Sequence, residues 1–98
     1  MLIIFTEENR TVNLDNFDEL RLEETGNFAV PIVLVAVRHN PPTELPIREF
    51  RRVEEFEANR LYKEIRDAWA KRAASYNITA SSFGRTPAYQ QSSPSRGI

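Results

Sequence analysis

Residues 28–37 read FAVPIVLVAV, a stretch of ten residues without a charge and without alternation between polar and apolar side chains. Successive side chains of a β-strand point to opposite faces of its sheet. A strand over this stretch is therefore apolar on both faces. One face presents Phe28, Val30, Ile32, Leu34 and Ala36, and the other presents Ala29, Pro31, Val33, Val35 and Val37. Each face needs a cover, so this stretch decides how the rest of the chain must pack.

Short strands are also expected on both sides of this stretch. Alternating or β-branched residues predict them over residues 2–6, 11–14, 18–24 and 44–50. The segment 25–27 contains Gly26 and predicts a hairpin turn, because glycine and asparagine tolerate the positive φ of tight turns. Pro46 places the strand 44–50 at a sheet edge, since proline cannot donate to the hydrogen-bond ladder.

The hydrophobic period changes from about residue 53 onward. Apolar residues then recur every three to five positions, as on one stripe of an amphipathic helix; they are Val53, Phe56, Leu61, Ile65, Ala68 and Trp69. Glutamates occupy the first turns, and Lys71 and Arg72 lie near the end, which complements the helix dipole. We expect the helix to end near Ser75.

After Asn77 the composition changes to serine, threonine, proline, glycine and glutamine without a visible period. Such a segment does not offset its own ordering entropy, so we expect it to be flexible unless a partner orders it. The sequence thus predicts an α+β domain over residues 1–76 and a Ser/Pro-rich tail over residues 77–98. In the domain, an antiparallel meander of four to five short strands packs against one long C-terminal helix.

One helix covers one face of a sheet, so the second apolar face of residues 28–37 needs another cover. Three explanations stay open: a strongly curled sheet, a second copy or another protein, or a bulge at Pro31 that changes the parity. A bare apolar edge strand aggregates, which favours a covering partner. We therefore expect Val33, Val35 and Val37 to bind a partner.

Charge is distributed unevenly along the chain. Residues 1–47 hold eight acids against three arginines, whereas residues 48–98 hold ten basic residues against six acids. Arginine makes bidentate contacts with carboxylates and phosphates that lysine does not make. A basic stripe of this kind can follow a phosphate backbone, but interleaved glutamates dilute it. The expected partner-binding residues therefore also include Arg48, Arg51, Arg52 and the tail anchors Phe83 and Tyr89.

The chain offers few residues for catalysis. It has no cysteine, which excludes disulfides, thiolate catalysis and cysteine-ligated metals. His39 lies in an expected loop without a nucleophile or paired acid at a recognisable spacing, and the three glycines form no phosphate-binding loop. We predict no enzyme activity and no catalytic, cofactor-binding or metal-binding residue. The longest apolar run is about half the length of a membrane span, and no signal peptide is visible, so we expect the cytoplasm or a phage (virion) assembly.

The opening residues 2–17, LIIFTEENRTVNLDNF, resemble the start of many small bacterial and phage proteins of unknown function. Those proteins begin with a strand, a turn and a second strand, and they finish with a helix. Residues 54–61, EEFEANRL, are similar to their Glu/Ala-rich helix start. The resemblance covers about residues 2–72 and carries no catalytic residue.

We expect a small non-enzymatic protein–protein interaction or assembly module. It would act as a subunit, or self-associate, through the apolar strand, and its partner would be another protein or a second copy. The alternative is a small regulator or inhibitor that binds a nucleotide or nucleic acid through an arginine-rich helix face.

Overall fold

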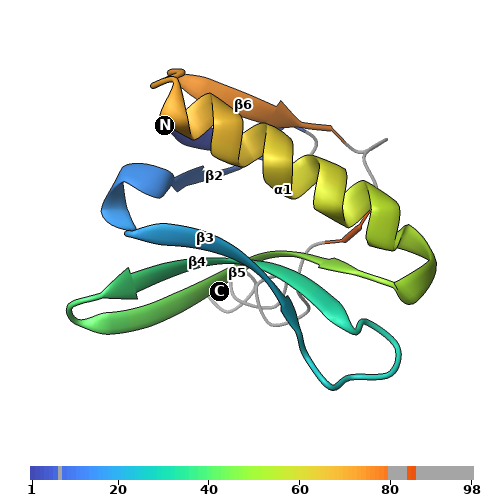
Figure 1. Cartoon of the computed structure of the whole chain (residues 1–98). Coiled ribbons are helices and arrows are strands. Elements are labelled where there is room, and N and C mark those ends of the chain that lie inside the picture. Colours follow the sequence, from blue (N-terminus) through green and yellow to red (C-terminus); the bar gives the residue numbers. More distant parts are fainter. Residues whose placement is uncertain (7, 80–83, 86–98) are drawn as a thin grey trace, which may run out of the picture.

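The computed structural model describes residues 1–6, 8–79 and 84–85, and it confirms the predicted α+β class. Two three-stranded sheets face each other, and the helix α1 runs along them and contacts strands of both (Figure 1). The elements in chain order are β1 (Leu2–Phe5), β2 (Arg10–Asn13), the 3-10 helix η1 (Leu14–Asn16), β3 (Glu19–Glu24), β4 (Ile32–His39), β5 (Pro42–Phe50), the 3-10 helix η2 (Arg52–Glu54), α1 (Glu55–Ala70) and β6 (Ser75–Ile78).

The first sheet has the strand order β2-β1-β6. The central strand β1 is antiparallel to β2 and parallel to β6, with Leu2 opposite Ser75 and Phe5 opposite Ile78. The strand β6 was not predicted, because residues 75–78 were assigned to the end of the helix and the start of the tail. The folded part of the chain thus extends to at least Ile78, beyond the predicted boundary after residue 76.

The second sheet has the strand order β3-β4-β5, and both pairs are antiparallel. Its central strand β4 carries most of the apolar stretch, but it begins at Ile32 rather than at Phe28 and runs on to His39. Residues 25–31 form a loop in place of the expected three-residue turn. A two-residue turn with a cis Asn40–Pro41 peptide bond joins β4 to β5.

A β-bulge interrupts the pairing of β4 with β5. Leu34 lies opposite Arg48 and Val35 lies opposite Pro46, so Ile47 is an extra residue on β5. A bulge changes which face the following side chains occupy. Ile47 and Arg48 are consequently both buried, and the simple alternation predicted for residues 44–50 is wrong. The bulge therefore lies on β5 rather than at Pro31, and β4 keeps a regular alternation, with Ile32, Leu34 and Ala36 in the core.

Helix α1 buries a different stripe from the expected one. Ala58 and Ile65 are fully buried, and Leu61, Tyr62, Ala68 and Trp69 pack partly against the core. Val53 and Phe56, which the sequence analysis placed in the core stripe, are exposed. The helix is also shorter than expected, ending at Ala70. The hydroxyl of Tyr76 donates a hydrogen bond to Glu64, which ties β6 to the helix.

One hydrophobic core fills the space between the two sheets and the helix. Its largest fully buried side chains come from both sheets, η1 and the helix, and they are Ile3, Phe5, Leu14, Leu34, Ile47, Phe50, Ile65 and Ile78. The inward face of β4 contributes Ile32, Leu34 and Ala36 to this core. The outward face of β4 therefore carries Val33, Val35 and Val37.

Candidate functional site

The outward valines of β4 are not an open apolar surface. Val35 is 2% exposed and Val37 is 5% exposed, while Val33 is half-buried. The strand register sets Arg21 beside Val35 and Glu19 beside Val37 on this face. Long charged side chains shield apolar neighbours with their aliphatic stems. The chain itself therefore buries Val35 and Val37, and the expectation that they are available to a partner is corrected.

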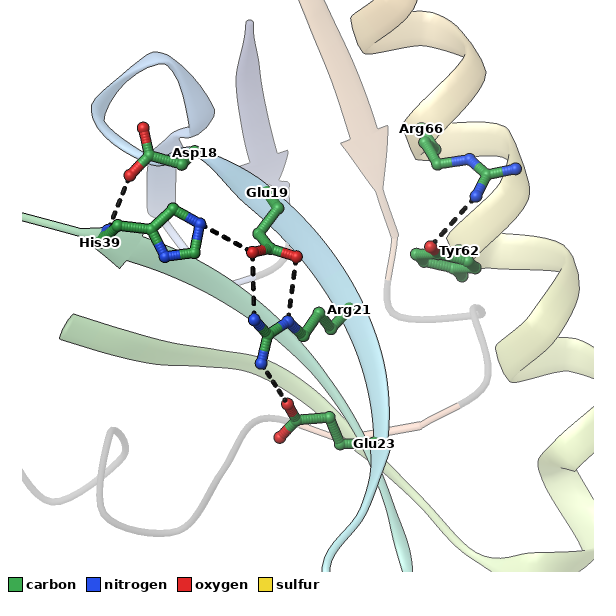
Figure 2. A network of polar contacts seen from close by, with 7 residues as sticks. All are labelled: Asp18, Glu19, Arg21, Glu23, His39, Tyr62 and Arg66. Carbon is green, nitrogen blue, oxygen red and sulfur yellow. Dashed lines mark hydrogen bonds and ion pairs between the residues drawn. The ribbon is translucent and has the colours of Figure 1, made fainter. Parts of the chain in front are cut away.

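A ladder of charged groups crosses this outward face (Figure 2). The guanidinium of Arg21 donates two hydrogen bonds of 3.0 Å to Glu19 and one of 3.3 Å to Glu23. These bonds hold the pKa of Glu19 below its usual range and raise the pKa of Arg21. His39 Nε2 lies 2.8 Å from Glu19, and the backbone N–H of His39 donates to Asp18. Glu19 is therefore paired with both Arg21 and His39. We interpret the ladder as a solvated face whose ion pairs stabilise the sheet.

Arg48 is another predicted contact residue that the structure removes from the surface. The bulge at Ile47 turns it inward, where it is 3% exposed. Its guanidinium donates to Glu8 at 3.2 Å and to the carbonyl of Gly84 at 3.3 Å, and it lies 5.9 Å from the ring centroid of Phe5. Arg48 is therefore an internal link rather than a partner-binding residue.

Gly84 and Arg85 lie on the free edge of β5. Arg85 and Glu49 exchange two backbone hydrogen bonds of 2.8 Å in an antiparallel bridge. The backbone N–H of Gly84 and the guanidinium of Arg85 both reach the buried carboxylate of Glu54. This edge contact therefore connects the chain after β6 to the start of the helix. The predicted anchors Phe83 and Tyr89 lie outside the described residues.

Glu54 is a buried acid at the junction between η2 and the helix. Burial raises its pKa, but the hydrogen bonds from Arg51 and from the backbone N–H of Gly84 outweigh this effect and hold the pKa of Glu54 below the ordinary glutamate value. The backbone N–H of Arg51 donates to Glu54 at 2.9 Å, and the Arg51 guanidinium lies 3.4 Å away. Glu54 thus remains ionised and anchors the entry into the helix.

Arg51 and Arg52 do lie on the surface, as predicted, and each forms an ion pair. Arg52 donates to Glu24 at 2.7 Å and lies 3.4 Å from Glu55. This contact joins the end of β3 to the first turn of α1. It brings the β3–β4 loop and the start of the helix to the same end of the molecule (Figure 1).

Three large apolar side chains are exposed at this end. Phe28, in the β3–β4 loop, is fully exposed, Val53 is 82% exposed and Phe56 is 75% exposed. We call these three residues the aromatic end. Contiguous apolar patches on a protein surface often mark binding sites. The sequence analysis missed this surface, because it assigned Phe28 to the strand and the other two residues to the core.

The β3–β4 loop is held in shape by its own hydrogen bonds. The side chain of Asn27 accepts from the backbone N–H of Ala29 at 2.8 Å. The hydroxyl of Thr25 accepts from the N–H of Asn27 at 2.9 Å and donates to the carbonyl of Val30 at 2.8 Å. The N–H of Thr25 also bonds the carbonyl of Pro31 at 2.8 Å. These bonds fix the loop on both sides of Phe28 and present its ring to solvent.

A small hollow lies beside the aromatic end. It has a volume of about 170 Å³, and it is lined by Leu22, Glu23, Glu24, Ile32, Glu55 and Asn59. Two larger hollows lie elsewhere. One, of about 540 Å³, lies beside Trp69, and the other, of about 400 Å³, lies beside the turn that joins β4 to β5. The hollow of about 170 Å³ is lined by residues next to the loop of Phe28 and by Glu55, the neighbour of Phe56.

The described residues contain no cluster of three or more histidine, aspartate or glutamate side chains placed to hold a metal ion. In the same part of the chain, no helix is long and apolar enough to cross a membrane. Comparison with protein-family models finds no match, and neither do searches of curated proteins and of solved structures. The surface of this chain is therefore the basis for inferring its function, and the resemblance to small phage and bacterial proteins stays a prediction.

Proposed function

We propose that this chain is a small protein–protein interaction module that binds its partner through the aromatic end. The observation that carries the proposal is Phe28, which is fully exposed at the tip of an internally hydrogen-bonded loop. Binding hot spots are enriched in large aromatic and arginine side chains. A side chain that is already held in place loses less entropy when it is bound. Both arguments favour Phe28 as the central anchor of an interface.

The surroundings of Phe28 support the same role. Val53 and Phe56 add apolar area at that end, and Arg51 and Arg52 border it, so two of the arginines predicted from the sequence adjoin the proposed site. An apolar centre with a charged rim is typical of protein interfaces. Membership of a larger assembly remains part of this proposal.

The alternative, phosphate binding through arginines, stays a prediction with less support. Arg52 is engaged by Glu24 and Glu55, and Arg60 is engaged by Glu57 and Glu64. A phosphate would have to displace these carboxylates. A salt titration separates the two functions, because phosphate contacts weaken steeply as salt concentration rises.

The proposal is tested by quantitative affinity capture with the whole chain as bait. The double variant Phe28→Ser, Phe56→Ser removes both aromatic anchors. A matched control is Lys63→Ser, because Lys63 is an exposed helix residue away from this end. We expect the double variant to lose a partner that both the wild-type chain and Lys63→Ser retain, with unchanged circular dichroism. If the wild-type chain and both variants capture the same proteins in equal amounts, the proposal is contradicted. The comparison includes capture of a second copy of the chain itself.

A further inference from the structure

We infer that the partner at the aromatic end is a second copy of this chain, and that each copy places Phe28 in the small hollow of the other. This inference rests on the proposed function and names its partner. It is carried by two features that lie at the same end: a fully exposed phenyl ring and a hollow of about 170 Å³. The hollow is open to solvent, and its volume is close to the roughly 150 Å³ of cavities that accept benzene.

The positions of the ring and the hollow fit a two-fold axis. The hollow is lined by Glu24 and Ile32, which are the residues on either side of the loop that carries Phe28. When two such loops cross in opposite directions, the tip of each reaches the base of the other. A two-fold dimer uses the same surface on both subunits, so ring and hollow must belong to one surface. Both lie at the end of the sheet where β3 is joined to β4.

The chemistry of the hollow also accepts this ring. Leu22 and Ile32 supply its apolar lining. Its three carboxylates are already paired, Glu23 with Arg21 and both Glu24 and Glu55 with Arg52. Residues 25–31 carry no charge, so the entering loop brings no charged group that must lose water. The positive edge of an aromatic ring is compatible with a carboxylate rim.

The area available at this end matches a dimer interface of ordinary size. Phe28, Phe56 and Val53 together expose on the order of 450 Å² of apolar surface, given the areas that aromatic residues bury. A standard interface buries about 800 Å² per partner, of which somewhat more than half is apolar. The three side chains supply that apolar share, and the paired charges around them supply a rim of both signs. Copies that each carry a net charge of −1 repel one another little.

The first test is the mass in solution, measured by light scattering and sedimentation equilibrium over a wide concentration range. We expect the wild-type chain to reach twice its mass of 11.3 kDa. Phe28→Ser removes the ring, and Asn59→Trp fills the hollow from its exposed wall without touching the ring. A hot-spot residue contributes about 2 kcal/mol to binding, and Phe28→Ser removes one such residue from each of the two copies. The dimer dissociation constant should therefore rise about 1,000-fold.

The matched control is Asp67→Trp, which adds the same side chain to an exposed position two turns further along α1. It should dimerise like the wild type, whereas Asn59→Trp should be monomeric at the same concentrations. A dimer that survives both Phe28→Ser and Asn59→Trp would overturn the inference. A wild-type chain that stays monomeric throughout would overturn it as well.

The second test locates the ring directly. A benzophenone-bearing phenylalanine at position 28 keeps an aromatic side chain, and illumination joins it to its neighbours. Mixing chains of two nitrogen isotopes distinguishes cross-links between copies from those within one copy. We expect mixed-isotope cross-links to the peptides that contain Ile32 or Asn59. Cross-links within single copies only would mean that Phe28 fills its own hollow, which contradicts the inference.

The failure of this inference is distinguishable from the failure of the proposed function. If the chain is monomeric but loses a captured protein on Phe28→Ser, Phe56→Ser, then the function stands and the partner is a different protein. If the chain is monomeric and the capture is unchanged, then both are wrong.

Discussion

Alanine substitutions at Ile65 and Phe56 test which face of α1 packs on the core. Ile65 is fully buried, whereas Phe56 is 75% exposed. Removing a buried isoleucine side chain costs the lost transfer free energy plus a cavity term, about 2–5 kcal/mol. We therefore expect Ile65→Ala to lower the free energy of unfolding by about 3 kcal/mol.

The expected loss at Phe56 is much smaller. About a quarter of the side chain is shielded, on the order of 50 Å², which is worth about 1.2 kcal/mol of burial. Alanine has the higher helix propensity, by roughly 0.5 kcal/mol, and this offsets part of the loss. Phe56→Ala should therefore change stability by less than about 1 kcal/mol. The sequence pattern alone assigned both residues to the same apolar stripe, so it predicted similar losses.

Urea unfolding measures the difference, with the fluorescence of Trp69 as the signal, because it is the single tryptophan and packs partly against the core. With a slope of roughly 1–2 kcal/mol per molar urea, Ile65→Ala should lower the midpoint by roughly 2 M and Phe56→Ala by less than roughly 1 M. The samples should be dilute enough to be monomeric, so that self-association does not contribute to the measured free energy of unfolding. Phe28→Ala is the control, since a fully exposed ring should leave the midpoint unchanged. Equal losses for Ile65→Ala and Phe56→Ala would mean that α1 is rotated about its axis relative to this structure, and the aromatic end would not exist.

Three further predictions concern the polar contacts. Burial and a hydrogen bond to a carboxylate raise the pKa of Tyr76 to about 12, so the folded chain binds this proton more tightly than the unfolded chain. The free energy of unfolding should therefore fall as the pH rises from about 10 toward 12. Tyr76→Phe should abolish this fall, as measured by absorbance titration and urea unfolding. A variant with the wild-type pH profile would contradict the raised pKa of Tyr76. The pKa of Glu54 is held below the ordinary value, so its carboxylate stabilises the fold at neutral pH, and that stabilisation is lost as the pH falls below about 4. Glu54→Gln should cost about 1–3 kcal/mol at neutral pH and flatten the acid limb of the stability curve, whereas a variant with wild-type acid sensitivity would refute this role. Gly84 has a φ of +90°, and an added Cβ would lie 2.7 Å from the ring of Phe50. Gly84→Ala should therefore release the edge contact and speed hydrogen exchange at the backbone amide of Glu49. Unchanged exchange at Glu49 would mean that the contact tolerates the methyl group.

The sequence predicted the parts of the fold that depend on local periodicity. The alternation of Leu20 and Leu22 with charged neighbours gives β3, and the change to a helical period near residue 53 gives α1. Both signals hold because one face of each element meets the core and the other meets water. The acidic start of the helix likewise agrees with its dipole.

The missed features depend on contacts between distant segments. The bulge at Ile47 is a matter of pairing between β4 and β5, and no pattern within β5 alone shows where the extra residue lies. The rotation of α1 follows from the close approach of Ala58 to the sheet, which a hydrophobicity pattern overlooks because alanine is small. The strand β6 exists because β1 offers it an edge.

The sequence around residues 25–27 does contain a local indication that Phe28 lies in a loop. Thr25 and Asn27 are residues whose side chains hydrogen-bond to their own backbone in turns. Taken together with Gly26, they indicate a loop that extends past residue 27, and such a loop removes Phe28 from the strand. The apolar stretch 28–37 thus combines a strand buried on both faces with one aromatic residue that the loop presents to solvent.

The uneven charge distribution acquires a structural explanation from the same contacts. Arg48 donates to Glu8 and Arg52 donates to Glu24, so two basic residues of the second half pair with acids of the first half across 40 and 28 positions of the chain. The first pair joins the buried Arg48 to the more exposed Glu8, and the second links the end of β3 to the start of the helix, at the end of the molecule where Phe28 is exposed. Arginine suits both places because it satisfies two acceptors from one planar group. Two of the arginines that first indicated phosphate binding therefore join the two halves of the fold.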